Sequence, residues 1–143
     1  MNNAGLLAFA LASAFSGAAL YGALVEQPAR LALDDRAMLN EWRPSDHRGF
    51  ILFALLSLLS ALAALAGFRD GGDIRWLVGA IMMIASWPYV FFVILPLDAR
   101  LRAMPQGGDS PDARVLMRDW GLLQWGLGAI GLVSAAVFAW ALA

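Results

Sequence analysis

Four long stretches of the sequence contain no charged residue, and this pattern constrains the fold more than any other feature. They cover residues 5–25, 50–68, 76–95 and 120–142. About 20 apolar residues in a helix are enough to cross the roughly 30 Å hydrocarbon core of a bilayer. Inside that core only a helix or a closed barrel satisfies every backbone polar group. The stretches therefore predict an all-α fold, an integral membrane four-helix bundle formed by residues 1–143 as one domain.

The composition agrees with a membrane protein and excludes several functions. Apolar residues make up 61% of the chain, and charged residues only 15%, against about 25% in soluble domains. The net charge of −1 gives no sign of a nucleic-acid partner. Without cysteine the chain has no disulfide, thiolate metal site or cysteine nucleophile. The single histidine, His47, excludes a histidine-rich metal centre, and we expect it at the surface. We expect no metal site, and the cofactor, if any, is not indicated.

The arginines predict the orientation in the membrane. An even number of spans places both termini on one side and the segments 26–49 and 96–119 on the other. Those two segments hold most of the basic residues: Arg30, Arg36, Arg43, Arg48, Arg100, Arg102, Arg114 and Arg118. Basic residues in short loops mark the cytoplasmic side. We therefore expect cytoplasmic loops and external termini, in a bacterial inner membrane. The stretch 5–25 has no basic segment ahead of it, so we expect a retained helix rather than a signal peptide.

The first long loop contains a short amphipathic pattern. In residues 31–42, Leu31, Met38, Leu39 and Trp42 fall on one side of a helix, while acidic residues and Arg36 fall on the other. Such a helix rests on the membrane interface or caps a bundle. A linker rich in Gly, Pro, Asp and Ser is expected at 102–114.

Charged residues gather where the first and third stretches end. Glu26 and Arg30 are four residues apart, so they share a helix face and can pair. Asp98 and Arg102 repeat this spacing. One interpretation is a pair of structural ion bridges at the helix ends. The other is a polar cluster at the mouth of a pocket, where Arg30 or Arg100 holds an anionic or carbonyl group and Glu26 moves a proton.

Two uncharged polar side chains interrupt the apolar stretches. Tyr89 follows Pro88, which disturbs the helix, and its hydroxyl can bind either a ligand or a freed carbonyl. Gln124 lies one turn into the last stretch, and a buried amide needs a partner. Together with Glu26 and Asp98, these residues can converge in the cytoplasmic half of the bundle interior.

A faint repeat links the two halves of the chain. Ala29-Arg30-Leu31 recurs as Ala99-Arg100-Leu101. A duplicated helical hairpin would give this pattern, and so would coincidence. Under the first interpretation, Arg30 and Arg100 are equivalent.

The polar motifs together resemble the anthrone-oxygenase-like family of four-helix membrane proteins, many of whose bacterial members are known only as a domain of unknown function. In chain order they read YGALVEQPAR, EWRPSDHRG, WPYVFFVILPLDARL and RDWGLLQW. The resemblance implies an oxidoreductase that uses molecular oxygen on a lipophilic phenolic or quinone-like substrate, held in a pocket between the helices. It implies Glu26 as the base and Arg30 as the group that stabilises negative charge. The implied substrate contacts are Tyr89, Asp98, Arg100, Gln124, Trp42 and Arg48.

The chain departs from the pattern of this family at four positions. Relatives often read VEHPAR, PxNxxL and WxxLHxxR, where this chain has Gln27, Asp98, Gln124 and Leu127. Two histidines and an arginine are thus missing, which leaves open whether the chain is catalytic. The alternative is a non-catalytic membrane protein that binds lipid or a partner helix. Small residues four apart, Ser13 and Gly17, then Ala18 and Gly22, permit close helix contact, so a homo-oligomer is a further expectation.

Overall fold

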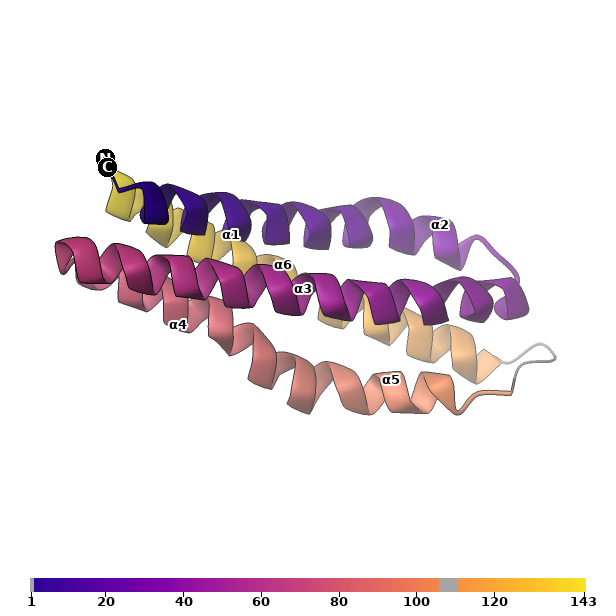
Figure 1. The fold of residues 1–143 in the computed structure, drawn as a ribbon. Coiled ribbons are helices and arrows are strands. Elements are labelled where there is room, and N and C mark those ends of the chain that lie inside the picture. Colours follow the sequence, from indigo (N-terminus) through magenta and orange to yellow (C-terminus); the bar gives the residue numbers. More distant parts are fainter. Residues whose placement is uncertain (1, 106–110) are drawn as a thin grey trace.

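The computed structural model describes residues 2–105 and 111–143, which form four long helical rods (Figure 1). Two of the rods consist of an α-helix, a short π-helical segment and a second, short α-helix. The other two are single helices. The first rod is α1 (Asn3–Tyr21), η1 (Gly22–Glu26) and α2 (Gln27–Leu31), and the second is α3 (Asp35–Gly71). The third is α4 (Ile74–Tyr89), η2 (Val90–Ile94) and α5 (Leu95–Arg102), and the fourth is α6 (Pro111–Leu142).

The rods form a bundle in which each packs against two neighbours. α1 contacts α3 and α6, and α4 contacts the same two helices. The α1 and α4 rods are therefore diagonal to each other. Both termini lie at the same end of the bundle (Figure 1). The prediction of an all-α four-helix bundle with its termini on one side is confirmed.

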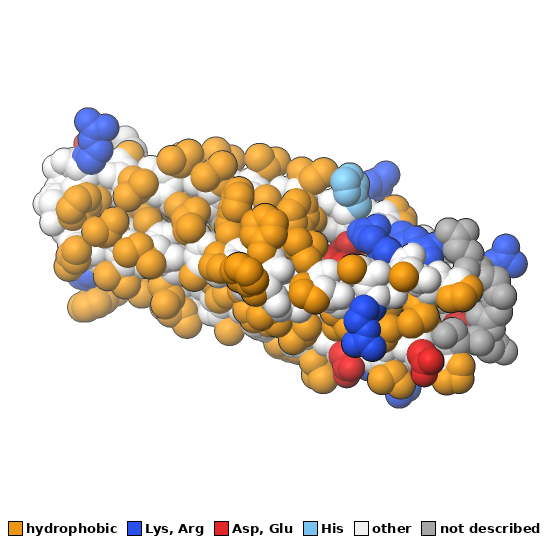
Figure 2. Space-filling model, turned by 90° about the horizontal axis from the view of Figure 1, so that it is seen from below, with side chains coloured by type: hydrophobic (Ala, Val, Ile, Leu, Met, Phe, Trp, Pro, Cys, Tyr) orange, Lys and Arg blue, Asp and Glu red, His pale blue; other side chains and the backbone are white. Residues whose placement is uncertain are grey.

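The surface of the bundle is that of a membrane protein. All four rods are long and apolar enough to cross a bilayer, and apolar side chains cover the middle of the face in Figure 2. On that face most charged side chains gather near the end opposite the termini, and few lie at the other end. α3 has 37 residues, a length of about 55 Å at 1.5 Å per residue. Its ends therefore extend beyond the hydrocarbon core. Which end faces the cytoplasm stays a prediction.

Polar residues define where the helices start and stop. Asn2 caps α1 by accepting a hydrogen bond from the Gly5 amide (2.8 Å), and Asp34 caps α3 by accepting one from the Ala37 amide (2.9 Å). α3 ends at Gly72, whose φ of 69° suits a residue without a side chain. Asp73 then caps α4, and the hydrogen bond from the Arg75 side chain holds the pKa of Asp73 below its usual range.

The amphipathic run 31–42 is not a separate interfacial helix, contrary to the prediction. Leu31 ends α2, and α3 begins at Asp35 and continues without interruption past Pro44. Met38 and Trp42 are completely buried in the bundle core, so burial rather than an interface stabilises this part. The segments predicted as loops, 26–49 and 96–119, are likewise largely helical. The part 106–110 of the predicted linker lies outside the described residues.

Both π-helical segments come just before a proline. η1 ends two residues before Pro28, and η2 ends two residues before Pro96. Proline has no N–H to donate, and its ring crowds the carbonyl four residues earlier. The wider π turn accommodates this, with the Gln27 amide bonded to the Gly22 carbonyl and the Leu95 amide to the Val90 carbonyl. The two segments lie in rods that are diagonal to each other.

Glycine permits the closest approach of α4 to α6. A methyl group added to Gly79 would lie 2.2 Å from a ring carbon of Phe138, whereas Gly17 has open space at the same position. We expect Gly79→Ala to lower the free energy of unfolding by about 1–3 kcal/mol through overpacking. Gly17→Ala should be neutral or stabilise by up to about 1 kcal/mol. Thermal unfolding in detergent, followed by circular dichroism, checks this, and equal melting temperatures for the two variants would contradict it.

Candidate functional site

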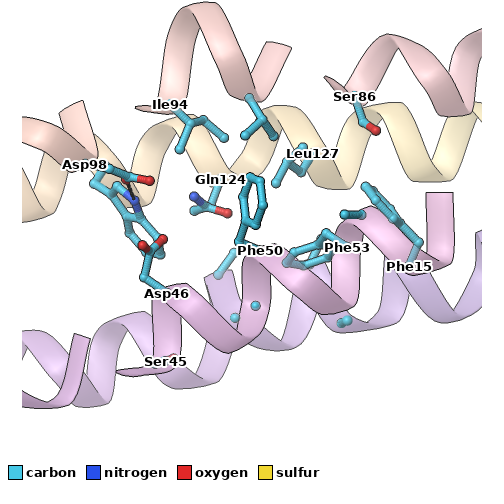
Figure 3. Close-up of a pocket in the computed structure, with 18 of the residues that line it drawn as sticks. Phe15, Ser45, Asp46, Phe50, Phe53, Ser86, Ile94, Asp98, Gln124 and Leu127 are labelled. Atoms are coloured by element: carbon cyan, nitrogen blue, oxygen red, sulfur yellow. Dashed lines mark hydrogen bonds between the residues drawn. The ribbon is translucent and has the colours of Figure 1, made fainter. Parts of the chain in front are cut away.

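A cavity of about 200 Å³ lies inside the bundle at the level of η1 and η2. All four rods contribute to its wall. One end is apolar and includes Phe15, Phe53 and Leu127. Polar side chains line the other end, where Figure 3 shows Asp46, Asp98 and Gln124. Both π-helical segments contribute to its wall, through Gly22 and Glu26 of η1 and through Val90 and Ile94 of η2. Mostly apolar walls with a few converging polar groups are typical of small-molecule sites.

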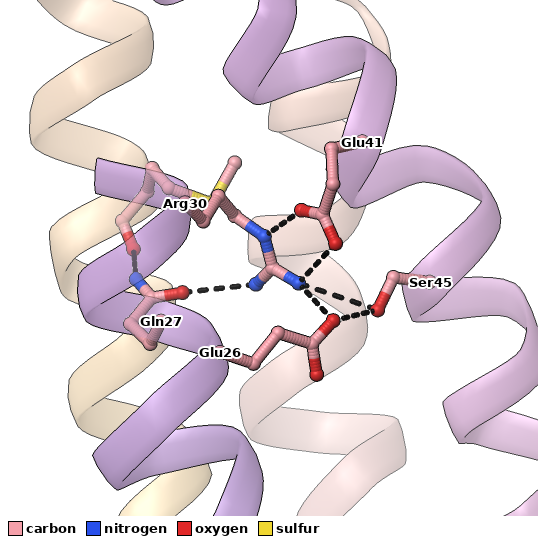
Figure 4. Close-up of polar contacts among 6 residues, drawn as sticks. Glu26, Gln27, Arg30, Glu41 and Ser45 are labelled. Atoms are coloured by element: carbon pink, nitrogen blue, oxygen red, sulfur yellow. Dashed lines mark hydrogen bonds and ion pairs between the residues drawn. The ribbon is translucent and has the colours of Figure 1, made fainter. Parts of the chain in front are cut away.

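Arg30 is the centre of a buried network at the polar end (Figure 4). Its side chain is only 2% exposed. The guanidinium donates to Glu26 at 2.8 Å, to the amide oxygen of Gln27 at 2.9 Å and also to Glu41. Ser45 donates to Glu26 and accepts from Arg30 at 3.3 Å. A buried charge is stable only when it is paired and hydrogen-bonded, and this network meets that condition by joining α2 to α3.

Gln27 connects the network to α6. Its amide nitrogen donates to the Met117 carbonyl at 2.8 Å, while its oxygen accepts from Arg30. The side chain packs directly on Gly121, where an added methyl group would lie 2.5 Å from the Gln27 nitrogen. The Gln27 amide therefore has a hydrogen-bond partner within the protein at both its nitrogen and its oxygen.

Besides the Arg30 network, two further polar contacts involve residues that line the cavity. Trp120 donates from Nε1 to Asp98 at 2.7 Å, and Arg102 forms an ion pair with Asp46. The Arg30 guanidinium lies 5.3 Å from the centre of the Trp120 ring, and that of Arg102 lies 5.1 Å from the Trp42 ring. Such cation–π contacts attract an arginine to the face of an aromatic ring, more strongly for the buried Arg30 than for the exposed Arg102. They also fix Trp120, and hence the Asp98 carboxyl, at the cavity wall.

Gln124 is a cavity residue whose whole amide group is without a hydrogen-bond partner among the described residues. It lines the wall and lies between the Asp98 end and the apolar end in Figure 3. No hydrogen bond to its amide is found in residues 2–105 and 111–143. Its two N–H donors and its carbonyl acceptor are thus available to a bound molecule.

The structure brings together some of the residues predicted for the site. Glu26, Arg30, Asp98 and Gln124 all line the cavity. Leu127 and Gln27 also line it. All four positions that depart from the family pattern therefore lie in the cavity wall. Ala18 and Gly22, predicted for contact between helices, border the same cavity. The predicted Glu26–Arg30 ion pair is present.

Tyr89 does not belong to the site, contrary to the prediction. Its hydroxyl donates to the Leu123 carbonyl at 2.7 Å, and its ring covers Gly126, where an added methyl group would lie 2.2 Å from the hydroxyl oxygen. Tyr89 therefore joins α4 to α6. The bound carbonyl belongs to α6 and is not one that Pro88 frees, so neither predicted partner, a ligand or a freed carbonyl, is the one observed.

Arg100 is exposed on α5 and does not line the cavity. The sequence repeat makes it equivalent to Arg30, but the two π-helical segments begin 68 residues apart, at Gly22 and Val90. By this register Asp98, not Arg100, occupies the place of Arg30. Asp98 does not pair with Arg102 either, because Arg102 bonds to Asp46.

Trp42 and Arg48 also lie outside the cavity. Trp42 is fully buried beside it, edge-on to Trp120 with 6.0 Å between ring centres, and its indole nitrogen has no hydrogen-bond partner within the described part of the chain. Arg48 is exposed and borders a shallow hollow on the outer surface. His47 is exposed as well.

Polar residues of the site that were not predicted are Glu41 in the Arg30 network and Ser45, Asp46, Ser57 and Ser86 in the cavity wall. Glu41 and Ser45 are four residues apart and therefore share a face of α3, which is a signal available in the sequence. That this face meets Arg30 depends on the turn at 32–34, which brings α3 back along α2. Among the described residues, no three acidic or histidine side chains come together as a metal site.

Comparison with known proteins gives one match. A family model described as anthrone oxygenase matches residues 42–137, which is most of the chain. No curated protein and no solved structure matches the chain.

Proposed function

Because the chain belongs to the anthrone oxygenase family, we propose that it is a membrane oxygenase acting on a flat, lipophilic phenol or anthrone. The observation that carries this proposal is the cavity, which has an apolar end and a polar end within the bundle. A ring system that dissolves in the bilayer matches the apolar walls. Its oxygen substituent matches the free amide of Gln124, and its methylene group would face the carboxyls at the polar end.

The reaction of an anthrone with oxygen balances without a further reductant. Two C–H bonds of the ring methylene break and a C=O bond forms. One atom of O₂ enters the product and the other leaves as water, so the four electrons lost by carbon reduce O₂. The first step is removal of a methylene proton by a carboxylate, which leaves an electron-rich enolate. Hydrogen-bond donors placed where charge develops lower the barrier of such a step.

Residues at the polar end suit these roles. Glu26, the base predicted from the sequence, uses one carboxylate oxygen to accept from Arg30 and Ser45. Asp98 uses one oxygen to accept from Trp120. Each has a second oxygen that can take a proton. In this proposal Gln124 donates to the enolate oxygen, and the positive charge of Arg30 stabilises the enolate without direct contact.

The volume of the cavity limits how many rings of a substrate it can enclose. An apolar cavity of about 150 Å³ is enough to hold benzene, and the one in this bundle is about 200 Å³. It therefore encloses one or two rings as it stands. A third fused ring would extend toward the outer surface of the bundle.

Oxygen uptake with an anthrone tests the proposal. We would reconstitute the protein in nanodiscs and compare wild type with Glu26→Gln and Asp98→Asn, which keep the shape and the hydrogen-bond acceptors. Loss of the catalytic base should lower the rate by about 10²-fold or more. Asp70→Asn, an exposed carboxyl at the far end of α3, is the matched control and should change nothing. Uptake by wild type no faster than by empty nanodiscs would overturn the proposal.

A second candidate function is storage or binding of a lipid without chemistry. It is favoured by the apolar end of the cavity and by aromatic lining residues that are exposed on the outer surface. Under this alternative, lipid should copurify at a fixed ratio to protein and no anthrone should be consumed. Mass spectrometry of the extracted lipid distinguishes the two functions.

A further inference from the structure

Two polar contacts join α3 to the α4–η2–α5 rod, and a stretch without hydrogen bonds between the two rods lies between them. Toward the termini, Trp87 donates from its indole nitrogen to the Ser57 hydroxyl at 2.9 Å. Toward the polar end, Arg102 forms its ion pair with Asp46. No hydrogen bond joins the two rods between these contacts in the described chain. Figure 1 shows the α4–η2–α5 rod diverging from α3 along this part.

The space between the two contacts is a window of substantial length. Asp46 and Ser57 are eleven residues apart on α3, which is about 16 Å at the rise of an α-helix. On the opposite side of the window lies η2, whose π turn displaces the backbone. The cavity lies directly behind, since its wall includes Asp46 and Ser57 of α3 and Trp87 and Phe91 of the facing rod.

Two aromatic side chains occupy the window. Phe50 of α3 and Phe91 of η2 both line the cavity and are also 43% and 50% exposed on the outer surface. They therefore contact the cavity on one side and lipid on the other. Phe92, the next residue, is 80% exposed and does not line the cavity. It faces lipid only.

We propose that a lipophilic ring compound reaches the cavity sideways from the bilayer through this window, and that Phe50 and Phe91 determine how readily it passes. Access from the charged end is obstructed by the Arg30 network and the Asp46–Arg102 pair. A flat aromatic molecule concentrates in the bilayer, where it meets the two phenyl rings at the window. The nature of the substrate rests on the proposed function, but the route itself does not.

The absence of cysteine permits a direct test of the route. Ser86 is buried and lines the cavity, so Ser86→Cys is a nearly isosteric thiol reporter, and Leu127→Cys is a second one on α6. In nanodiscs we would measure the rate at which N-phenylmaleimide, which partitions into lipid, modifies each thiol. A charged, water-soluble methanethiosulfonate reports access from the aqueous side.

Removing a ring from the window should accelerate modification. In the Ser86→Cys background we expect Phe50→Ala and Phe91→Ala each to raise the N-phenylmaleimide rate by about tenfold, equal to about 1.4 kcal/mol in the barrier. Phe92→Ala and Ile51→Ala, which also remove exposed apolar side chains but lie outside the cavity wall, should leave the rate unchanged.

Other outcomes overturn the inference. Equal rates in the window and control variants exclude the two phenylalanines as the barrier. Faster modification by the charged reagent than by the maleimide places access at the aqueous end, and no modification of either thiol excludes a window. Since labelling needs no turnover, a negative oxygen-uptake experiment together with a positive labelling experiment would reject the reaction and retain the route.

Discussion

Arg30→Leu is expected to lower the free energy of unfolding by about 3 kcal/mol, the lower end of the range for breaking a buried ion pair from one side. The guanidinium bonds to Glu26, Gln27, Glu41 and Ser45, and its loss leaves two carboxylates close together without a cation. Their side chains are 34% and 37% exposed, so partial hydration keeps the effect below the upper end. Thermal unfolding in detergent is the measurement.

Three further variants test whether the loss of stability is specific to the buried Arg30 network. Arg100→Leu removes an exposed arginine near the same end and should leave the melting temperature unchanged. Arg30→Lys keeps the charge but loses the planar set of donors, so an intermediate loss is expected. Adding Glu26→Gln and Glu41→Gln to Arg30→Leu should recover part of the stability, because no unpaired charge remains. An unchanged melting temperature in Arg30→Leu would show that the network contributes nothing to stability.

Gly22→Leu is expected to weaken ligand binding by about tenfold or more without destabilising the protein. Gly22 lines the cavity, and an added methyl group there would meet no atom within 4 Å. A leucine therefore occupies space that a ligand would use. Replacing a helical glycine also removes an entropic cost of about 0.5–1 kcal/mol. Binding of an anthraquinone is measured by quenching of tryptophan fluorescence, since Trp87 and Trp120 line the cavity.

Gly17→Leu is the matched control for this experiment. Gly17 has the same open space around it and lies on the same rod, but it does not line the cavity. It should bind the anthraquinone as wild type does. If Gly22→Leu and Gly17→Leu bound it equally well, the ligand site would have to lie elsewhere.

The π-helical segment η2 explains why the sequence repeat made Arg100, rather than Asp98, the counterpart of Arg30. Sequence spacing assigns residues to helix faces by assuming 3.6 residues per turn, and one wide turn shifts every later residue around the axis. Asp98 and Arg100 lie after η2, so Asp98 faces the cavity and Arg100 faces outward. Glu26 and Arg30 were predicted correctly as a pair because a spacing of four within one rod does not depend on the register of the other rods.

The sequence alone determined the number of rods and the position of the turn that ends α3. Four uncharged stretches must become helices because a bilayer offers no other partner to the backbone, and Gly72 permits the left-handed conformation that ends α3. Tertiary structure alone decided that Glu41 and Ser45 of α3 bind Arg30 and that the four rods enclose a cavity. Those contacts depend on how separate helices align, and alignment is fixed by packing over the whole bundle rather than by local spacing.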